Sequence, residues 1–427
     1  MSFKYFLYFC IFAIPFLPQG TGFYFGHGVP TLDLPRILMI LLIFSWLIKK
    51  AVHGECFHLY KGNITNFLLL LIIAQFISIF AADKLIQSTV VWIGYLLYYY
   101  VIFFILSDQI KTDEEWRKIF KTITFLGVGM AIVAIIEFIL QRGIYDQFRF
   151  AWLANPSLNL NFELWRIEGL MVSKGPYGGS QSFGFFFSII FFLVLYDFLR
   201  EKKKSAKVYK LMETIMVALA LLTTQVRAAI IAVSVSFVIS LFLQKLSRQQ
   251  IKNILLSSTI ILVSIIIINR AVPAGFWQYT FSESVTKIQR EQSTFFKRVD
   301  GLKITLEDIA KKPILGYGTG AVVKHMSQIS KFELRSDLPL AIAFYIESGV
   351  FGFLAFLGLI YSLLVSLWRF HEKHKTEMLP YYLLLSFLSY IISTSSAPQL
   401  ESSFIFFVLL AYAAFLTKKK TINISII

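Results

Sequence analysis

The sequence has little charge and almost no cysteine. Of its 427 residues, 15% are charged, 57% are hydrophobic and two are cysteines, and the mean hydropathy is +0.68. A soluble domain of ordinary composition carries about 25% charged residues, so the chain is too apolar to be a soluble enzyme. Cys10 lies in an apolar run and Cys56 in a basic connection, which argues against a disulfide between them.

The hydrophobic residues come in long blocks that are nearly free of charge. Examples are 66–81, 119–140 and 253–268, which approach the ~20 residues that a helix needs to cross a bilayer. The blocks predict an all-α integral membrane protein, with 1–427 forming a single polytopic domain of about twelve transmembrane helices. The expected spans are 4–17, 34–48, 66–81, 86–106, 119–140, 181–199, 209–222, 228–243, 253–268, 346–368, 379–395 and 402–416.

The formal charge of +16 is spread over the connections between these blocks. A nucleic-acid-binding protein would gather its basic residues in one patch or helix, so no nucleic-acid partner is expected. The positive-inside rule places the basic clusters, and with them both termini, in the cytoplasm. The clusters are Lys49-Lys50, Lys111 with Arg117-Lys118, Arg200 with Lys202-Lys203-Lys204, Lys245 with Arg248, Arg369 with Lys373 and Lys375, and Lys418-Lys419-Lys420.

Two long connections then face the outside, a smaller extracytoplasmic loop at 141–180 and a larger one at 269–345. In the larger loop, apolar residues recur at helical spacing from Val299 to Ile309, and a lysine pair precedes Pro313. These features predict a short amphipathic helix at the outer membrane surface. The sequence Gly-Tyr-Gly-Thr-Gly at 316–320 predicts a turn, and it lacks the lysine of a nucleotide-binding loop.

Three arginines are expected at or beyond the outer ends of helices: Arg166, Arg227 and Arg298. A guanidinium binds two phosphate oxygens at once, so several together would neutralise a pyrophosphate. An isolated interfacial arginine is more often a headgroup anchor, and that alternative stays open. The presence of three on the face that carries the folded loop favours an anion-binding site.

Carboxylates on the same face are candidates for proton transfer. Asp337 lies just before the span 346–368, and Glu347 lies inside it. A partly buried carboxylate has a raised pKa that suits a general base, although either residue could instead pair with an arginine. Trp165 could form a platform for a sugar, or it could belong to the aromatic belt of the interface. No acidic cluster with metal-ligand spacing is visible, so neither a metal nor a cofactor is expected.

Four short motifs follow one another along the chain. They are Arg166-Ile167-Glu168-Gly169 with Gly175-Pro176 and Gly184, Thr224-Gln225-Val226-Arg227-Ala228, Arg298 through Leu306 with Lys312-Pro313-Ile314-Leu315-Gly316-Tyr317-Gly318, and Glu347-Ser348-Gly349-Val350-Phe351-Gly352. In this order they resemble the O-antigen ligase and polymerase superfamily, bacterial membrane glycosyltransferases that act on undecaprenyl-diphosphate-linked glycans.

The resemblance implies a metal-independent membrane glycosyltransferase in the bacterial cytoplasmic (inner) membrane, with its active site facing the periplasm or exterior. Its substrate would be an undecaprenyl-diphosphate-linked oligosaccharide, and its partners membrane lipid, a chain-length regulator and a flippase. Arg227, Arg298 and Asp337 would be the catalytic residues. The substrate-binding residues would be Arg166, Trp165, Tyr317 and Glu347.

One departure from the family pattern bears on the reaction. Ligases of this family usually carry a His-Asn pair shortly before the glutamate, whereas this chain has Ser336-Asp337. The resemblance therefore favours a polymerase of a surface polysaccharide such as O-antigen, capsule or exopolysaccharide. The alternatives are a ligase that moves finished glycan to a lipid or protein acceptor and a flippase for the lipid-linked glycan, although a transporter is expected to show repeat symmetry and midplane polar residues.

Overall fold

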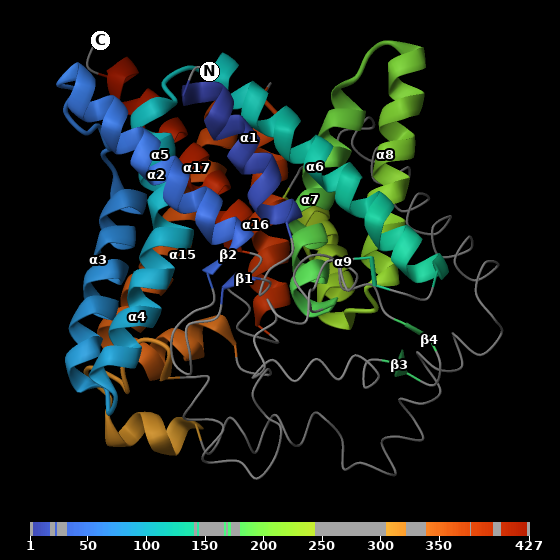
Figure 1. Ribbon diagram of the computed structural model, residues 1–427. Coiled ribbons are helices and arrows are strands. Elements are labelled where there is room, and N and C mark those ends of the chain that lie inside the picture. The colour runs from blue at the N-terminus through green and yellow to red at the C-terminus, as the bar shows by residue number, and fades with distance from the viewer. Residues whose placement is uncertain are drawn as a thin grey trace.

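The computed structural model describes eleven parts of the chain and gives them an almost entirely helical architecture (Figure 1). The described residues are 3–17, 22–23, 32–140, 143–144, 166–167, 170–171, 180–243, 305–321, 339–375, 377–395 and 403–424.

Each helix coincides with an apolar block of the sequence, and α4 and α5 share the block 86–106. The helices are α1 (Phe3–Phe16), α2 (Leu34–His53), α3 (Asn63–Ser78), α4 (Leu85–Tyr95), α5 (Val101–Gln109), α6 (Asp113–Leu140), α7 (Ser180–Arg200), α8 (Lys204–Thr223), α9 (Arg227–Leu243), α15 (Leu340–Lys373), α16 (Leu379–Thr394) and α17 (Ser403–Ile424). A short 3-10 helix, η1 (Ile79–Ala81), follows α3, and a π-helical turn, η2 (Leu96–Tyr100), joins α4 to α5.

Two small antiparallel hairpins lie in the connections. β1 (Gly22–Phe23) pairs with β2 (Leu32–Asp33), and β3 (Arg166–Ile167) pairs with β4 (Leu170–Met171). Asp33 then caps α2, because its side chain accepts a hydrogen bond from the backbone N–H of Arg36 at 3.0 Å.

Five helical stretches are long and apolar enough to cross a membrane: Asn63–Ala81, Leu85–Gln109, Asp113–Leu140, Gln181–Arg200 and Leu340–Lys373. Four shorter apolar helices accompany them: Phe3–Phe16, Arg227–Ser240, Leu379–Thr394 and Phe404–Lys418. The chain is therefore an all-α, membrane-embedded protein, as the composition predicts. A helix occurs at every expected span within the described residues, whereas 253–268 lies outside them, so the number of crossings stays a prediction.

Outward-facing side chains support this environment. Phe44, Phe125 and Tyr361 belong to three different helices and expose 58%, 68% and 67% of their surface. Soluble monomers rarely expose large contiguous apolar patches. Lipid tails are apolar and surround such side chains readily, and helices can lie in lipid because they satisfy their own backbone hydrogen bonds.

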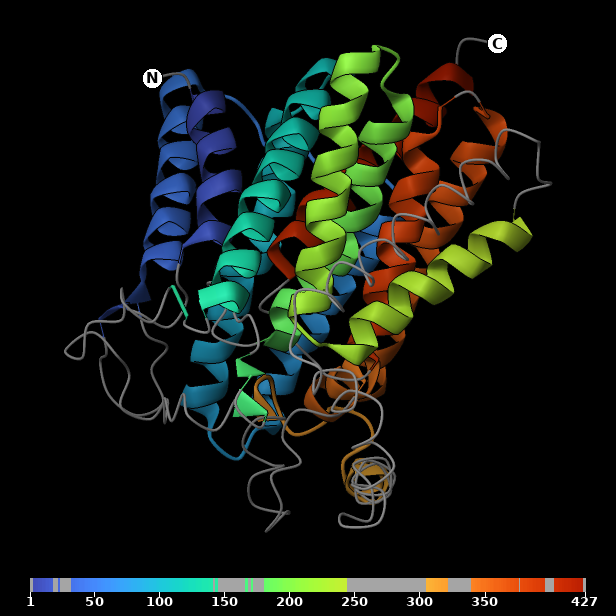
Figure 2. The ribbon, with the colours of Figure 1, turned by 90° about the vertical axis from the view of Figure 1, so that its right-hand side faces the viewer.

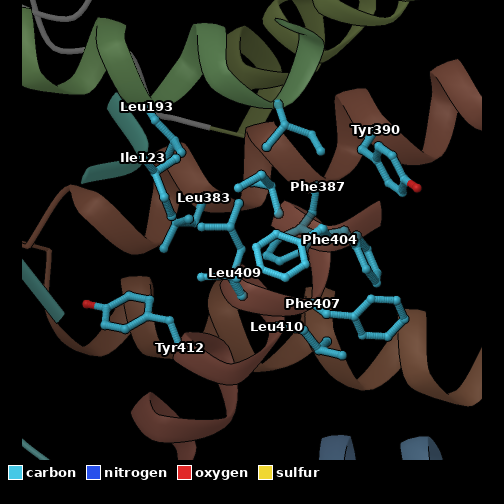
Figure 3. Close-up of a cluster of buried hydrophobic side chains, with 14 of the residues drawn as sticks. Ile123, Leu193, Leu383, Phe387, Tyr390, Phe404, Phe407, Leu409, Leu410 and Tyr412 are labelled. Carbon is cyan, nitrogen blue, oxygen red and sulfur yellow. The ribbon is translucent and has the colours of Figure 1, made fainter. Parts of the chain in front are cut away.

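The centre of the bundle is packed by α6, α7, α16 and α17 (Figure 3). Ile123, Leu193, Leu383 and Phe387 meet there with Leu409, and each is at most 1% exposed. Helix α7 is the most enclosed of the five long apolar stretches, because 83% of its most apolar part is buried. A helix that is hydrophobic on all sides suits this central position.

The two ends of the bundle differ in which segments they carry (Figures 1 and 2). One end carries both chain termini, and we call it the terminal end. The opposite end carries segment 305–321, the start of α15 and the start of α9, and we call it the loop end. From the loop end, α9 runs at a steep tilt to its neighbours (Figure 2).

Candidate functional site

Helix α15 is broken near its start, at the loop end. Gly349 has φ 61° and ψ −161°, which interrupts the helical hydrogen-bond pattern. The span expected at 346–368 thus begins earlier, at Leu340. A short helical segment leads to the break at Gly349, and the long remainder of α15 follows it. The break frees backbone carbonyls that need other partners, because an unsatisfied backbone group is costly away from water.

Segment 313–318 supplies those partners. The backbone N–H of Tyr317 donates to the carbonyl of Ile346 at 2.8 Å, and that of Gly318 donates to the carbonyl of Glu347 at 3.0 Å. In return, the N–H of Val350 donates to the carbonyl of Pro313 at 2.9 Å. We call segment 313–320 together with 346–350 the glycine clasp.

Glycine is required on both sides of this contact. A Cβ atom added to Gly316 would lie 2.4 Å from the carbonyl oxygen of Ile346, and one added to Gly349 would lie 2.1 Å from that of Ile314. Both glycines also have positive φ, which side chains with a Cβ rarely adopt. The two glycine-rich motifs, some thirty residues apart in sequence, are therefore two halves of one structure.

The clasp is also fixed to the ends of α3 and α4. The Thr319 hydroxyl donates to the carbonyl of Gln75 at 2.9 Å, and the Ser88 hydroxyl donates to the carbonyl of Thr319 at 2.9 Å. At the surface, the Lys312 ammonium pairs with Asp83 at 3.2 Å. These anchors join the connection before α15 to the N-terminal part of the bundle.

Tyr317 and Glu347 both belong to the clasp. The Tyr317 hydroxyl donates to the carbonyl of Asp308 at 2.9 Å, which ties the short helix 305–311 to the turn. Burial, reinforced by the Asp308 carboxylate, raises the pKa of Tyr317, so its hydroxyl stays a neutral donor at physiological pH. Glu347 is 4% exposed and lies close enough to Tyr100 to interact with it electrostatically.

A pocket of about 40 Å³ lies between the clasp and the start of α4. Its lining includes Asp83, Gln87, Tyr317 and Thr319. Ligand sites for small organic molecules generally measure about 300–1,000 Å³, so this pocket has room for water and not for a sugar.

Arg227 begins α9, and a tight connection from α8 places it there. Gln225 has φ 53° and is the only residue other than glycine with positive φ in the described part of the chain. Beside it, Val226 packs closely on α7, because a Cβ added to Gly184 would lie 2.7 Å from the Val226 Cβ. The exposed Arg227 therefore follows a strained turn that is held against the central helix.

The electrostatics at the start of α9 favour an anion. Its first turn contains no acidic residue, and Arg227 makes no ion pair with any residue that the structure describes. A helix N-terminus carries partial positive charge from its unpaired N–H groups. The guanidinium adds a full positive charge to that field.

Of the remaining expected site residues, the structure describes only Arg166. Arg166 lies in β3, where it is opposite Met171 of β4. Trp165, Arg298 and Asp337 lie outside the described residues, so their roles stay predictions. Within the described residues, no group of three or more His, Cys, Asp or Glu side chains could hold a metal ion.

Sequence reasoning did not anticipate the break in α15 or the anchors Thr319 and Ser88. Gly349 gave a signal, because a glycine two residues after a glutamate inside an apolar run fits neither helix propensity nor the bilayer interior. Gln75 gave another, because it is the only amide side chain between residues 67 and 81.

The chain matches no protein-family model and no curated protein sequence. The resemblance to glycosyltransferases therefore depends on the short motifs alone, and the activity that it implies has to be tested by substituting residues within them.

Proposed function

We propose that this protein is a polymerase of a bacterial surface polysaccharide. It would transfer glycan from undecaprenyl diphosphate to a sugar hydroxyl of another lipid-linked repeat, at the outer face of the cytoplasmic membrane. The observation that carries the proposal is Arg227, an exposed guanidinium at the start of α9 and at the same end of the bundle as the glycine clasp.

The orientation follows from the distribution of charge. Lys50, Lys118 and Arg200 belong to clusters expected in the cytoplasm, and α2 and α7 end, and α6 begins, at the terminal end (Figure 1). The loop end would then face outward. Nucleotide sugars are cytoplasmic, so a lipid-linked glycan is the activated donor that suits this face.

The reaction needs stabilisation of a leaving diphosphate. The acceptor hydroxyl oxygen forms a bond to the anomeric carbon, the bond from that carbon to the diphosphate oxygen breaks, and the hydroxyl proton passes to a base. Arg227 and the α9 N-terminus would bind the charge that develops on the diphosphate, with Arg298 as a second guanidinium. Asp337 is the proposed base.

The glycine clasp has a supporting role in this proposal. It fixes the connection that leads from the larger loop into α15, and it fixes Glu347 within the break. A transferase benefits when the groups around the reacting atoms are held rigidly, because a preorganised site needs no rearrangement during the reaction.

The test uses purified protein and an undecaprenyl-diphosphate-linked repeat, with product scored as a polymer ladder. Arg227→Ala should reduce the rate by about 10²–10³, and single repeats should accumulate. Arg227→Lys should be clearly impaired, because lysine keeps the charge and loses the planar fork. Arg369→Ala is the matched control, an exposed arginine in the last turns of α15. Normal ladders from correctly folded Arg227→Ala would reduce Arg227 to an interface anchor and refute the catalytic assignment.

A further inference from the structure

A second cavity, of about 350 Å³, lies at the terminal end, away from the proposed catalytic face. It is formed by the start of α6, the end of α7, the start of α16 and part of α17. Its volume falls within the range of small-molecule sites. Trp116 and Phe120 line it, and they are 1% and 8% exposed.

Two tyrosines that line this cavity have hydroxyl groups without a hydrogen-bond partner among the described residues. Tyr382 and Tyr412 are 9% and 6% exposed, and neither hydroxyl makes a hydrogen bond to any residue within the described parts of the chain. Figure 3 shows the Tyr412 hydroxyl turned away from the apolar cluster that surrounds Leu409. A hydroxyl that is open to a cavity and makes no hydrogen bond to the protein is free to donate to an oxygen atom of a bound molecule.

Charged groups of both signs surround the hydroxyls. The Arg200 guanidinium lies 3.5 Å from the Tyr196 hydroxyl. Arg117 lies close enough to Tyr196 and Tyr412 to interact with both electrostatically. Two carboxylates that line the cavity, Asp113 and Glu377, also lie close enough to Tyr412 to interact with it. Guanidinium and phenol donors suit phosphate oxygens, whereas a carboxylate suits an ammonium group.

The depth of the cavity indicates where its occupant comes from. The expected spans begin at 119 and 379 and end at 199, so the rim residues Arg117, Arg200 and Glu377 would lie at the level of the lipid headgroups. Apolar walls below charged rims fit a molecule with a polar head and an apolar body.

We propose that this cavity binds the headgroup of a zwitterionic glycerophospholipid of the cytoplasmic leaflet. Its phosphate lies between Arg117, Arg200 and the Tyr412 hydroxyl, and its ammonium group lies at Glu377. The bound lipid joins the ends of α6, α7 and α16 at the membrane surface. This site is independent of the polymerase proposal, because the two lie at opposite ends of the bundle.

Native mass spectrometry of the delipidated full chain tests this proposal. Phosphatidylethanolamine, phosphatidylglycerol and inorganic phosphate are titrated separately. The wild type should bind phosphatidylethanolamine about tenfold or more tightly than phosphatidylglycerol, because only the former has an ammonium group for Glu377. Inorganic phosphate should not compete at lipid concentrations.

Three variants locate the binding. Arg117→Ala/Arg200→Ala should weaken phosphatidylethanolamine binding by at least about tenfold, since it removes both charge-assisted donors. Lys118→Ala/Lys121→Ala removes the same charge from exposed positions of α6 outside the cavity lining and should bind as the wild type does. Tyr412→Phe removes one oxygen from the cavity and should cost roughly fivefold. Unchanged binding by the folded double-arginine variant would show that the lipid does not bind in this cavity. Equal binding of phosphatidylglycerol would show that the site does not select a zwitterionic headgroup. Effective competition by inorganic phosphate would show that the site binds free phosphate and not a lipid.

Discussion

Lys50 at the terminal end and Arg227 at the loop end are both cations near the end of a helix, yet their surroundings are opposite. Lys50 is 5% exposed and pairs with the buried Asp108 at 2.8 Å. Arg227 is exposed, and no acid in the described residues pairs with it. A paired, buried cation contributes to structure, whereas an exposed guanidinium on a helix N-terminus is available to an anionic ligand.

The two ends are also held together by different interactions. Asp108 joins three segments at the terminal end, because it pairs with Lys50 and accepts hydrogen bonds from the Trp46 indole at 2.8 Å and the His58 N–H at 2.9 Å. At the loop end, backbone hydrogen bonds between two glycine-rich segments take that role. The glycine clasp thus depends on main-chain groups, whereas the cluster around Asp108 depends on side chains.

The contrast between the two ends requires that they face opposite sides of the membrane. Cys56 is exposed and precedes α3 at the terminal end, so a membrane-impermeant maleimide should leave it unlabelled in intact cells and label it after permeabilisation. In a Cys56→Ser background, Glu307→Cys in the helix of the larger loop should be labelled in intact cells or spheroplasts. The reverse pattern would place the loop end in the cytoplasm and remove the polymerase proposal.

The next largest effect is expected at the clasp. Gly349→Ala forces a side chain into a glycine-only backbone conformation, which costs of order 1–3 kcal/mol, and sets its Cβ atom 2.1 Å from the Ile314 carbonyl oxygen. The melting temperature in detergent should fall sharply, and polymer synthesis should be lost.

Gly94→Ala is the matched control, because a Cβ added to Gly94 has open space in α4. Its melting temperature should equal or slightly exceed that of the wild type, since alanine is the better helix former. Equal stability of the two variants would show that the clasp does not hold the loop end.

The two ends should also differ in how much their ion pairs contribute to stability. Asp108→Asn removes the buried charged partner of Lys50 and leaves the ammonium with only the half-exposed Glu55 carboxylate; breaking a buried ion pair typically costs about 3–5 kcal/mol. Asp83→Asn at the loop end removes the partner of Lys312, but the Asp83 side chain is 70% exposed, so its melting curve should match that of the wild type. A loss as large as that of Asp108→Asn would show that the ion pair, as well as the backbone, secures the clasp.

Helix positions could be predicted from the sequence because each apolar block is a strong local signal. Helix α2 was expected to end at 48 and continues to His53, because Lys49 and Lys50 extend its last turns until Gly54 ends it with φ 60°. The start of α15 at 340 was missed for a different reason. A helical break is stable only when a distant segment satisfies its carbonyls, and the sequence gives no direct information about which segment does so.

The candidate site was predictable in its parts and not in its assembly. The motifs around Gly316 and Gly349 were recognised separately, but their contact depends on a long-range approach of two backbones. Gly184 and Val226 show the same limitation, since one motif supplies the glycine and another supplies the side chain packed on it. Spacing along the chain defines a turn, whereas the partner of that turn is set by the packing of whole helices.

The smallest expected effect concerns the second partner of Lys50. Glu55 lies 3.2 Å from the same ammonium, but its side chain is 45% exposed, against 0% for Asp108. The hydrogen bond from Lys50 lowers the pKa of Glu55, so this pair stabilises the fold above the unfolded-state pKa of about 4.3 and loses that contribution as the pH falls through the lower folded-state pKa.

Glu55→Gln should therefore lower the melting temperature slightly at pH 7 and should not differ from the wild type in acid below the pKa of Glu55, where the wild-type carboxyl is also neutral. Lys50 remains charged over this range, because hydrogen bonds to Asp108 and Glu55 outweigh the opposing effect of burial and raise its pKa. Melting curves of both proteins at several pH values measure the difference. A loss of stability at pH 7 as large as that of Asp108→Asn would mean that burial does not determine how much each ion pair stabilises the protein. The contrast between a structural Lys50 and an available Arg227 would then lose its physical basis.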